Sequence, residues 1–91
     1  MELDSMYDLS VNGNVNDIRI FFEIVGYINF QIEFFGYKKI LENNIKLFDY
    51  LCELCKVYGV EYGMYNDVEN IRNMCDNLDS KFMDMLNEKF K

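Results

Sequence analysis

Apolar side chains recur at every second position in two short runs in the first third of the chain. The first run ends at Ile24 and the second begins at Ile28. The alternating positions are Ile18, Ile20, Phe22 and Ile24, followed by Ile28, Phe30, Ile32 and Phe34. A period of two places side chains on one face of a β-strand. The pattern therefore predicts two strands joined by a hairpin loop at residues 25–27.

The register of this hairpin follows from the same pattern. With residues 25–27 as the loop, each apolar residue of the first run faces one of the second. Arg19 then faces Glu33 on the opposite side of the hairpin, where opposite charges attract. A slip of one residue would move a whole apolar row to the wrong face, so the register is well specified.

Two more strands are predicted outside the hairpin. Residues 6–11 alternate and precede Asn12-Gly13, a dipeptide typical of two-residue hairpin turns. A looser turn reaching Asp17 is an equal alternative. Residues 60–64 also alternate and predict a short fourth strand.

A first amphipathic helix is predicted from Asn43 or Asn44, either of which can cap its start, to Tyr58. Gly59 follows, and glycine is the favoured residue after a helix end. The apolar stripe of this helix comprises Leu47, Leu51, Leu54, Cys55 and Tyr58.

A second helix is predicted from Asp67 to Phe90, after Asn66 as a cap. Its apolar stripe comprises Val68, Ile71, Cys75, Leu78, Phe82, Met85 and Leu86. The helix would be about 36 Å long, against a radius of gyration of about 12 Å for a globule of this size. Its last turns are therefore expected to overhang, which allows a homodimer through Met85, Leu86 and Phe90.

Together these elements predict an α+β fold with the order β-β-β-α-β-α. The architecture is a two-layer sandwich, in which an antiparallel meander and a fourth strand carry two helices on one face. The length of 91 residues fits a single domain over residues 1–91. With 51% hydrophobic residues, eight phenylalanines and seven tyrosines, the chain has ample material for a core.

Localisation and origin follow from composition. No apolar run approaches the roughly 18 residues that span a bilayer, and the acidic start Met1-Glu2-Leu3-Asp4 is unlike a signal peptide. A cytoplasmic protein, in a bacterium or in the cytosol of an infected host, is expected. The chain lacks alanine and proline and has seven lysines but two arginines, a usage that indicates an AT-rich genome, such as that of a phage, plasmid or large virus.

The net charge of −7 bears on partners. An acidic surface repels the phosphates of nucleic acids and the headgroups of anionic membranes, so neither is an expected partner. A protein partner with a basic surface would be attracted. The same charge can also serve only to keep a small apolar domain in solution.

Side chains suited to catalysis are few. The chain has no histidine, which excludes Ser-His, Cys-His and His-metal sites within it. Its hydroxyl groups outside tyrosine belong to Ser5, Ser10 and Ser80, none in a recognisable motif. Cys52 and Cys55 form a CxxC sequence, but it lies in the middle of a predicted helix rather than at the N-terminus that activates a redox thiol. They are expected to be core residues, as is Cys75, and no catalytic, metal or cofactor-binding residue is predicted.

Two segments and the order of the predicted elements resemble known families. Residues 8–15 resemble the first positions of an EF-hand calcium loop, but Arg19 stands where the closing glutamate belongs. The element order resembles the core of GNAT acyltransferases, which implies acetyl-coenzyme A binding at residues 37–44; the two glycines of that family's pyrophosphate loop are replaced by Glu42 and Asn44. Residues 12–29 resemble one ankyrin repeat, with Ile18, Phe21, Phe22 and Val25 at helical spacing, without a second copy.

The outer face of the predicted sheet supplies the functional hypothesis. Aromatic rings among charges are typical of protein interfaces, and the side chains expected there are Phe21, Glu23, Glu33, Phe35 and Tyr37. We therefore expect a small, acidic, non-catalytic protein that binds and modulates or inhibits another protein by occlusion, for example an anti-CRISPR-like factor of a mobile element. A degenerate acyltransferase-like protein and a structural homo-oligomer are the alternatives.

Overall fold

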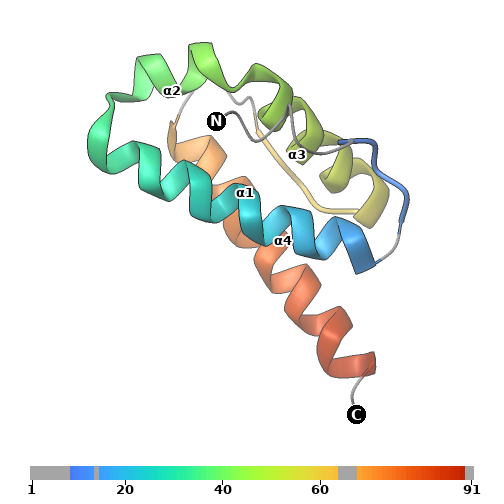
Figure 1. Ribbon diagram of the computed structural model, residues 1–91. Helices are drawn as coiled ribbons and strands as arrows, with labels where there is room; N and C mark the ends of the chain where they lie inside the picture. Colours follow the sequence, from blue (N-terminus) through green and yellow to red (C-terminus); the bar gives the residue numbers. More distant parts are fainter. Residues whose placement is uncertain (1–8, 14, 64–67, 90–91) are drawn as a thin grey trace.

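All the regular secondary structure of the described residues is α-helical. The computed structural model describes residues 9–13, 15–63 and 68–89, and these contain four α-helices and no β-strand. The helices are α1 (Val15–Phe34), α2 (Tyr37–Asn43), α3 (Ile45–Tyr58) and α4 (Val68–Lys89). In Figure 1, α1, α2 and α3 follow one another around one end of the molecule, and α4 crosses behind α1.

The predicted hairpin is a single helix, so the α+β sandwich is wrong. Both predicted strands and their loop at Gly26 lie within α1. The residues of α1 that the fold buries follow helical spacing, not alternation; they are Asp17, Ile18, Ile20, Phe21, Ile24 and Ile28. In a run this rich in apolar residues both periods are present, and the helix buries one complete stripe against α3 and α4.

The other predicted strands are absent from the described residues as well. Residues 9–13 and 60–63 have no regular secondary structure, while residues 6–8 and Met64 lie outside the described residues. The GNAT-like arrangement loses its basis, because the segment expected to hold a pyrophosphate loop is helix α2.

Both predicted helices of the second half are confirmed over their described residues. Gly59 ends α3 in the left-handed conformation, with φ 68° and ψ 35°, and its N–H bonds to the carbonyl oxygen of Cys55. The end of α4 at Lys89 lies close to the predicted boundary; Asn66 and Phe90 lie outside the described residues.

Asn44 connects three helices in a way that differs from its predicted role. It precedes α3 as predicted, but its side chain does not cap the helix. Its Nδ2 group instead donates to the carbonyl oxygen of Ile40 in α2 at 2.9 Å and to Oε1 of Gln31 in α1 at 2.7 Å. This buried amide fixes the α2–α3 junction against the end of α1.

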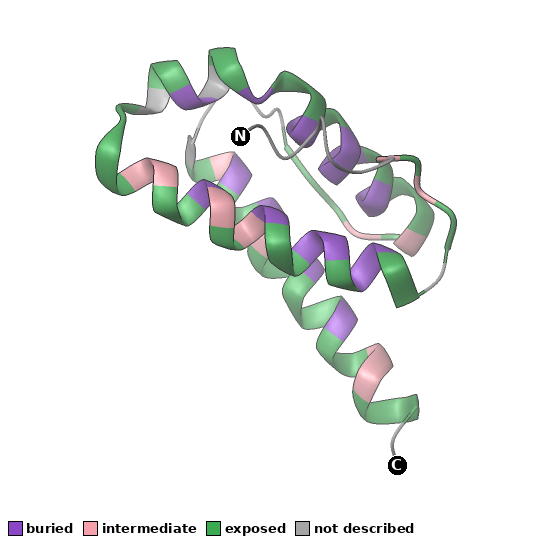
Figure 2. Cartoon of the chain, in the orientation of Figure 1, coloured by how far each residue is buried: buried purple, intermediate pink, exposed green. Residues whose placement is uncertain are grey.

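The hydrophobic core lies where α1, α3 and α4 meet. Figure 2 shows the buried positions on the sides of α1 and α3 that face each other. Phe82 of α4 is fully buried and contacts Phe21 of α1 and Tyr58 of α3 edge to face, with ring centroids 5.1 and 5.0 Å away. The predicted stripe of α3 is buried except for Tyr58, which is partly buried. In the predicted stripe of α4, Ile71, Leu78 and Phe82 are buried, whereas Cys75, Met85 and Leu86 are partly buried. The side chain of Val68 lies outside the described residues.

The C-terminal turns of α4 project beyond the other helices, as the length of this helix predicted (Figure 1). Met85 and Leu86 are nevertheless half-buried, because they pack against the edge of the chain's own core. The expected dimer contact through Met85, Leu86 and Phe90 stays a prediction.

Candidate functional site

Asp17, in the first turn of α1, is fully buried and ties the start of α1 to a loop and to α3. Its carboxylate accepts hydrogen bonds from the backbone N–H groups of Asn12 at 3.3 Å and Gly13 at 2.7 Å. It also accepts from the hydroxyl groups of Tyr50 at 3.3 Å and Tyr58 at 2.7 Å. Donors from the loop before α1 and from α3 therefore converge on one carboxylate, which stabilises the negative charge in the interior.

The surroundings of Asp17 explain the state of both tyrosines. Burial raises the pKa of Tyr50, and the nearby Asp17 charge raises it further. Burial likewise raises the pKa of Tyr58, together with its hydrogen bond to Asp17. Both phenols therefore stay protonated donors near neutral pH. In the segment that resembles an EF-hand loop, the N–H groups of Asn12 and Gly13 donate to the Asp17 carboxylate of the same chain. Asp17 with its four donors is therefore a structural anchor within the fold.

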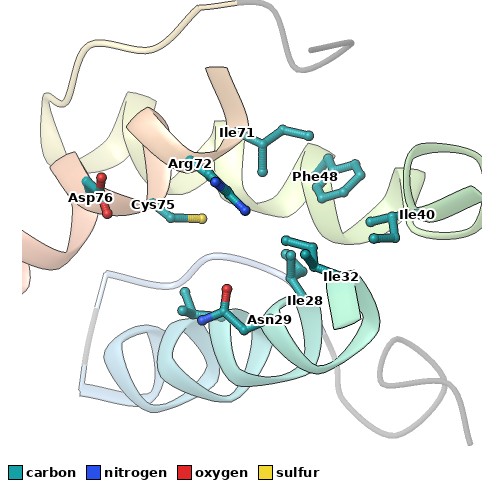
Figure 3. A pocket seen from close by; sticks show the side chains of 10 residues that line it. Ile28, Asn29, Ile32, Ile40, Phe48, Ile71, Arg72, Cys75 and Asp76 are labelled. Atoms are coloured by element: carbon teal, nitrogen blue, oxygen red, sulfur yellow. The ribbon is translucent and has the colours of Figure 1, made fainter. Parts of the chain in front are cut away.

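A cavity of about 230 Å³ lies between the helices and opens to solvent. Its lining comprises Val25, Ile28, Asn29, Ile32, Ile40, Phe48, Ile71, Arg72, Cys75 and Asp76. Figure 3 shows the aliphatic and aromatic side chains gathered at one end, while Arg72, Cys75 and Asp76 from α4 lie toward the other. A cavity with this lining can accept a small, mainly apolar molecule with one polar group.

The thiols of the chain are poorly suited to nucleophilic chemistry. Burial raises the pKa of Cys75, at the cavity wall, to about 12. Burial also raises the pKa of Cys55 to about 12 and raises the pKa of Cys52. Thiolates are the reactive form, so these groups are inert near neutral pH. The prediction that Cys52 and Cys55 are core residues is confirmed by their burial, and all three cysteines are unpaired thiols.

The solvent-facing side of α1 carries a row of aromatic rings. Phe22, Gly26, Phe30 and Phe34 are spaced four residues apart, which places them along one side of the helix. The three rings are 39%, 60% and 64% exposed, in chain order, and the last two contact each other with centroids 4.8 Å apart. We call this surface the α1 outer face; it comprises these four residues with Arg19, Glu23 and Glu33.

The charges of the α1 outer face lie among its rings. Arg19 and Glu23, one helical turn apart, form an ion pair of 3.3 Å between Nη1 and Oε1, and both side chains are exposed. Glu33 is exposed near the other end of the helix. Such an exposed pair contributes little to stability and can exchange its partner at little cost.

The structure disperses the predicted interface residues. Phe21 is 1% exposed and lies in the core, so its expected role as an exposed anchor is wrong. Glu23 and Glu33 are exposed, as predicted. Phe35 is exposed just beyond α1, with Nζ of Lys39 5.9 Å from its ring centre. The side chain of Tyr37 lies outside the described residues.

Sequence reasoning missed the rings of the α1 outer face because it placed Phe22, Phe30 and Phe34 beneath the helices. One signal could have revealed them. Arg19 and Glu23 are spaced as an ion pair on one side of a helix, and the phenylalanines four residues apart continue that side.

Comparisons of the chain with models of protein families, with curated proteins and with solved structures found no match. Among the described helices, none combines the length and apolar character needed to cross a bilayer. In the same residues, no three cysteine, aspartate or glutamate side chains are grouped so as to hold a metal ion.

Proposed function

We propose that this chain is a non-catalytic protein-binding module whose contact surface is the α1 outer face. The exposed row of Phe22, Phe30 and Phe34 carries the proposal. Scattered apolar side chains are normal on a protein surface, but three exposed aromatic rings along one side of a helix are typical of an interaction site. Rings flanked by charges match the composition of interface cores, in which phenylalanine, tyrosine and arginine are enriched.

The rigidity of the scaffold supports this proposal. The rings project from one helix of 20 residues, whose opposite stripe is buried against the rest of the fold. A partner would therefore meet side chains whose backbone is already ordered, which lowers the entropy lost on binding. The raised pKa values of the thiols favour binding over nucleophilic catalysis.

Charge and location complete the proposal. The net charge of −7 would attract a basic partner at long range. The α1 outer face itself has one cation and two anions, so binding there depends mainly on its rings. We place the chain in the cytoplasm, where occlusion of a partner's surface would make it a modulator or inhibitor.

Affinity capture from the cells that naturally contain the chain tests this function. The bait proteins are the wild type, a Phe30→Ser/Phe34→Ser variant and a control, Val57→Ser, which removes an exposed apolar side chain from α3. A partner retained by the wild type and the control but lost by the double variant is the expected result. Equal retention by all three baits would assign binding to another surface.

A further inference from the structure

We infer that the α1 outer face binds a second copy of this chain, with the two α1 helices antiparallel and crossing at Gly26. This inference rests on the proposed function and names its partner. It arises from a symmetry of the face about Gly26. Phe22 and Phe30 lie four residues before and after Gly26, and Arg19 and Glu33 lie seven residues before and after it.

In an antiparallel pair of α1 helices related by a two-fold axis, this symmetry makes the two outer faces complementary to each other. Such an axis brings each residue beside the residue equally far from Gly26 on the other chain. Phe22 of one copy then lies beside Phe30 of the other, about 6 Å along the helix from the crossing point. Arg19 lies beside Glu33 of the second copy, about 10.5 Å from that point. Each copy supplies one cation and one anion, so two opposite-charge pairs form.

Gly26 suits a crossing point and nothing else in its surroundings explains it. It lies in the interior of α1, where glycine costs roughly 1 kcal/mol relative to alanine. A Cβ atom built there meets no atom of the chain within 4 Å, and its φ is not positive. The absence of a side chain allows a second helix backbone to approach closely between the flanking rings.

The charge of the face favours a second copy over a strongly charged partner. The chain as a whole carries −7, which makes two copies repel each other at most orientations. The α1 outer face repels a second copy much less than the rest of the surface does, because its charges, Arg19, Glu23 and Glu33, nearly cancel. One helix from each copy gives an interface at the small end of the specific range, so a dissociation constant on the order of micromolar is expected.

Sedimentation equilibrium of the purified full chain, over a wide range of concentrations, tests the inference. The wild type is expected to pass from 10.9 kDa to twice that mass. Arg19→Glu and Glu33→Arg each place like charges opposite one another twice, so each should weaken association about tenfold or more. Mixing these two variants pairs a chain with anions at positions 19 and 33 against a chain with cations at both positions, and a heterodimer should form. Lys46→Glu and Glu42→Arg are charge-matched controls on other helices, and both should dimerise like the wild type.

A variant without a charge change provides a second measurement. Gly26→Leu inserts a side chain at the crossing point and should leave the protein monomeric with its helix content intact. A wild type that remains monomeric at the highest concentration, or a dimer that Arg19→Glu and Glu33→Arg leave unchanged, overturns the inference. The second result would indicate another surface, such as the end of α4. Neither result touches the proposed function, which the affinity capture of a foreign partner decides separately.

Discussion

The hydroxyl group of Tyr58, at the end of α3, donates a hydrogen bond of 2.7 Å to the carboxylate of Asp17, 41 residues earlier in the chain. This bond joins the start of α1 to the end of α3 across the core. The carboxylate also accepts from Tyr50 and from the loop before α1. Asp17 therefore fixes how α1 lies on α3, and with it the direction of the α1 outer face.

Replacing Asp17 should be among the most destabilising single changes in this chain. Asp17→Ala leaves two tyrosine hydroxyls and the backbone N–H groups of Asn12 and Gly13 without their acceptor. Each such group that stays buried costs about 1–3 kcal/mol. We expect the free energy of unfolding to fall by about 3 kcal/mol or more, measured by urea denaturation. Asp79→Ala, an exposed carboxylate on α4, should change it by about 0.5 kcal/mol or less. Equal effects of the two substitutions would show that the Asp17 anchor is not formed.

Alkaline pH should destabilise the protein through its buried phenols and thiols. Burial raises the pKa of Cys55 from 9.0 to about 12, and burial with Asp17 raises that of Tyr58 above its usual 10.0. The folded state then holds protons that the unfolded state has released, so stability falls as the pH rises above about 9. Below that pH these groups are protonated in both states and contribute no slope.

Chemical denaturation at several pH values, with phenolate absorbance as a second probe, measures this effect. Tyr58→Phe should give a shallower alkaline loss of stability, because one of the shifted groups is removed. An unfolding free energy that does not change up to about pH 11 would contradict the assigned burial of these groups.

Two glycines should respond in opposite ways to the same substitution. Gly59→Ala forces an L-residue into the left-handed region at φ 68°, and should cost about 1 kcal/mol. Gly26→Ala lies inside a helix with open space around the new Cβ atom, and should stabilise the monomer fold by about 0.5–1 kcal/mol. Thermal unfolding of both variants under conditions that keep the chain monomeric checks the signs. A loss of stability for Gly26→Ala would argue against a continuous α1.

Two adjacent phenylalanines of α1 lie in different environments, Phe21 in the core and Phe22 at the surface. Phe21 is fully buried and contacts Phe82, so Phe21→Ala should lower the free energy of unfolding by about 3–5 kcal/mol. Phe22 is 39% exposed, and its ring centroid lies 5.3 Å from that of Phe21. Phe22→Ala should cost about 1 kcal/mol or less. A β-hairpin would reverse this order, since it buries Phe22 and exposes Phe21.

The second half of the chain could be predicted because its polar residues are regularly placed. In α3, Lys46, Asp49, Glu53 and Lys56 are all exposed and leave one apolar stripe for the core. Gly59 then marks the end of this helix through the conformation it alone adopts easily. In such a segment the helical spacing and the end of the helix can be recognised without knowing what the helix packs against.

The first half misled because its apolar residues satisfy two periods. Ile18, Ile24 and Ile28 are buried in the helix, and they are also inward positions of the hypothetical hairpin. Isoleucine and phenylalanine favour strands by intrinsic preference, but burial of a helical stripe against α3 and α4 outweighs that preference. The matched positions about Gly26 are a symmetry of the sequence, and we infer that they serve contact between two copies of α1 rather than a hairpin.

The candidate site was predicted only in part, for the same reason. Glu23 and Glu33 are exposed in a helix as they would be in a strand, whereas Phe21 and Phe22 exchange roles between the two. The Asp17 anchor and the cavity bring together residues far apart in the chain, and the spacing of neighbouring residues in the sequence does not predict such contacts.

Photo-crosslinking in cells tests the central claim, that the α1 outer face is an interaction surface, most directly. A benzophenone side chain is placed at position 30 on that face or at position 57 on α3, both solvent-exposed. We predict an adduct from position 30 only, and a mass of twice 10.9 kDa would identify a second copy as the partner. No adduct from position 30, or equal adducts from both positions, would contradict the account.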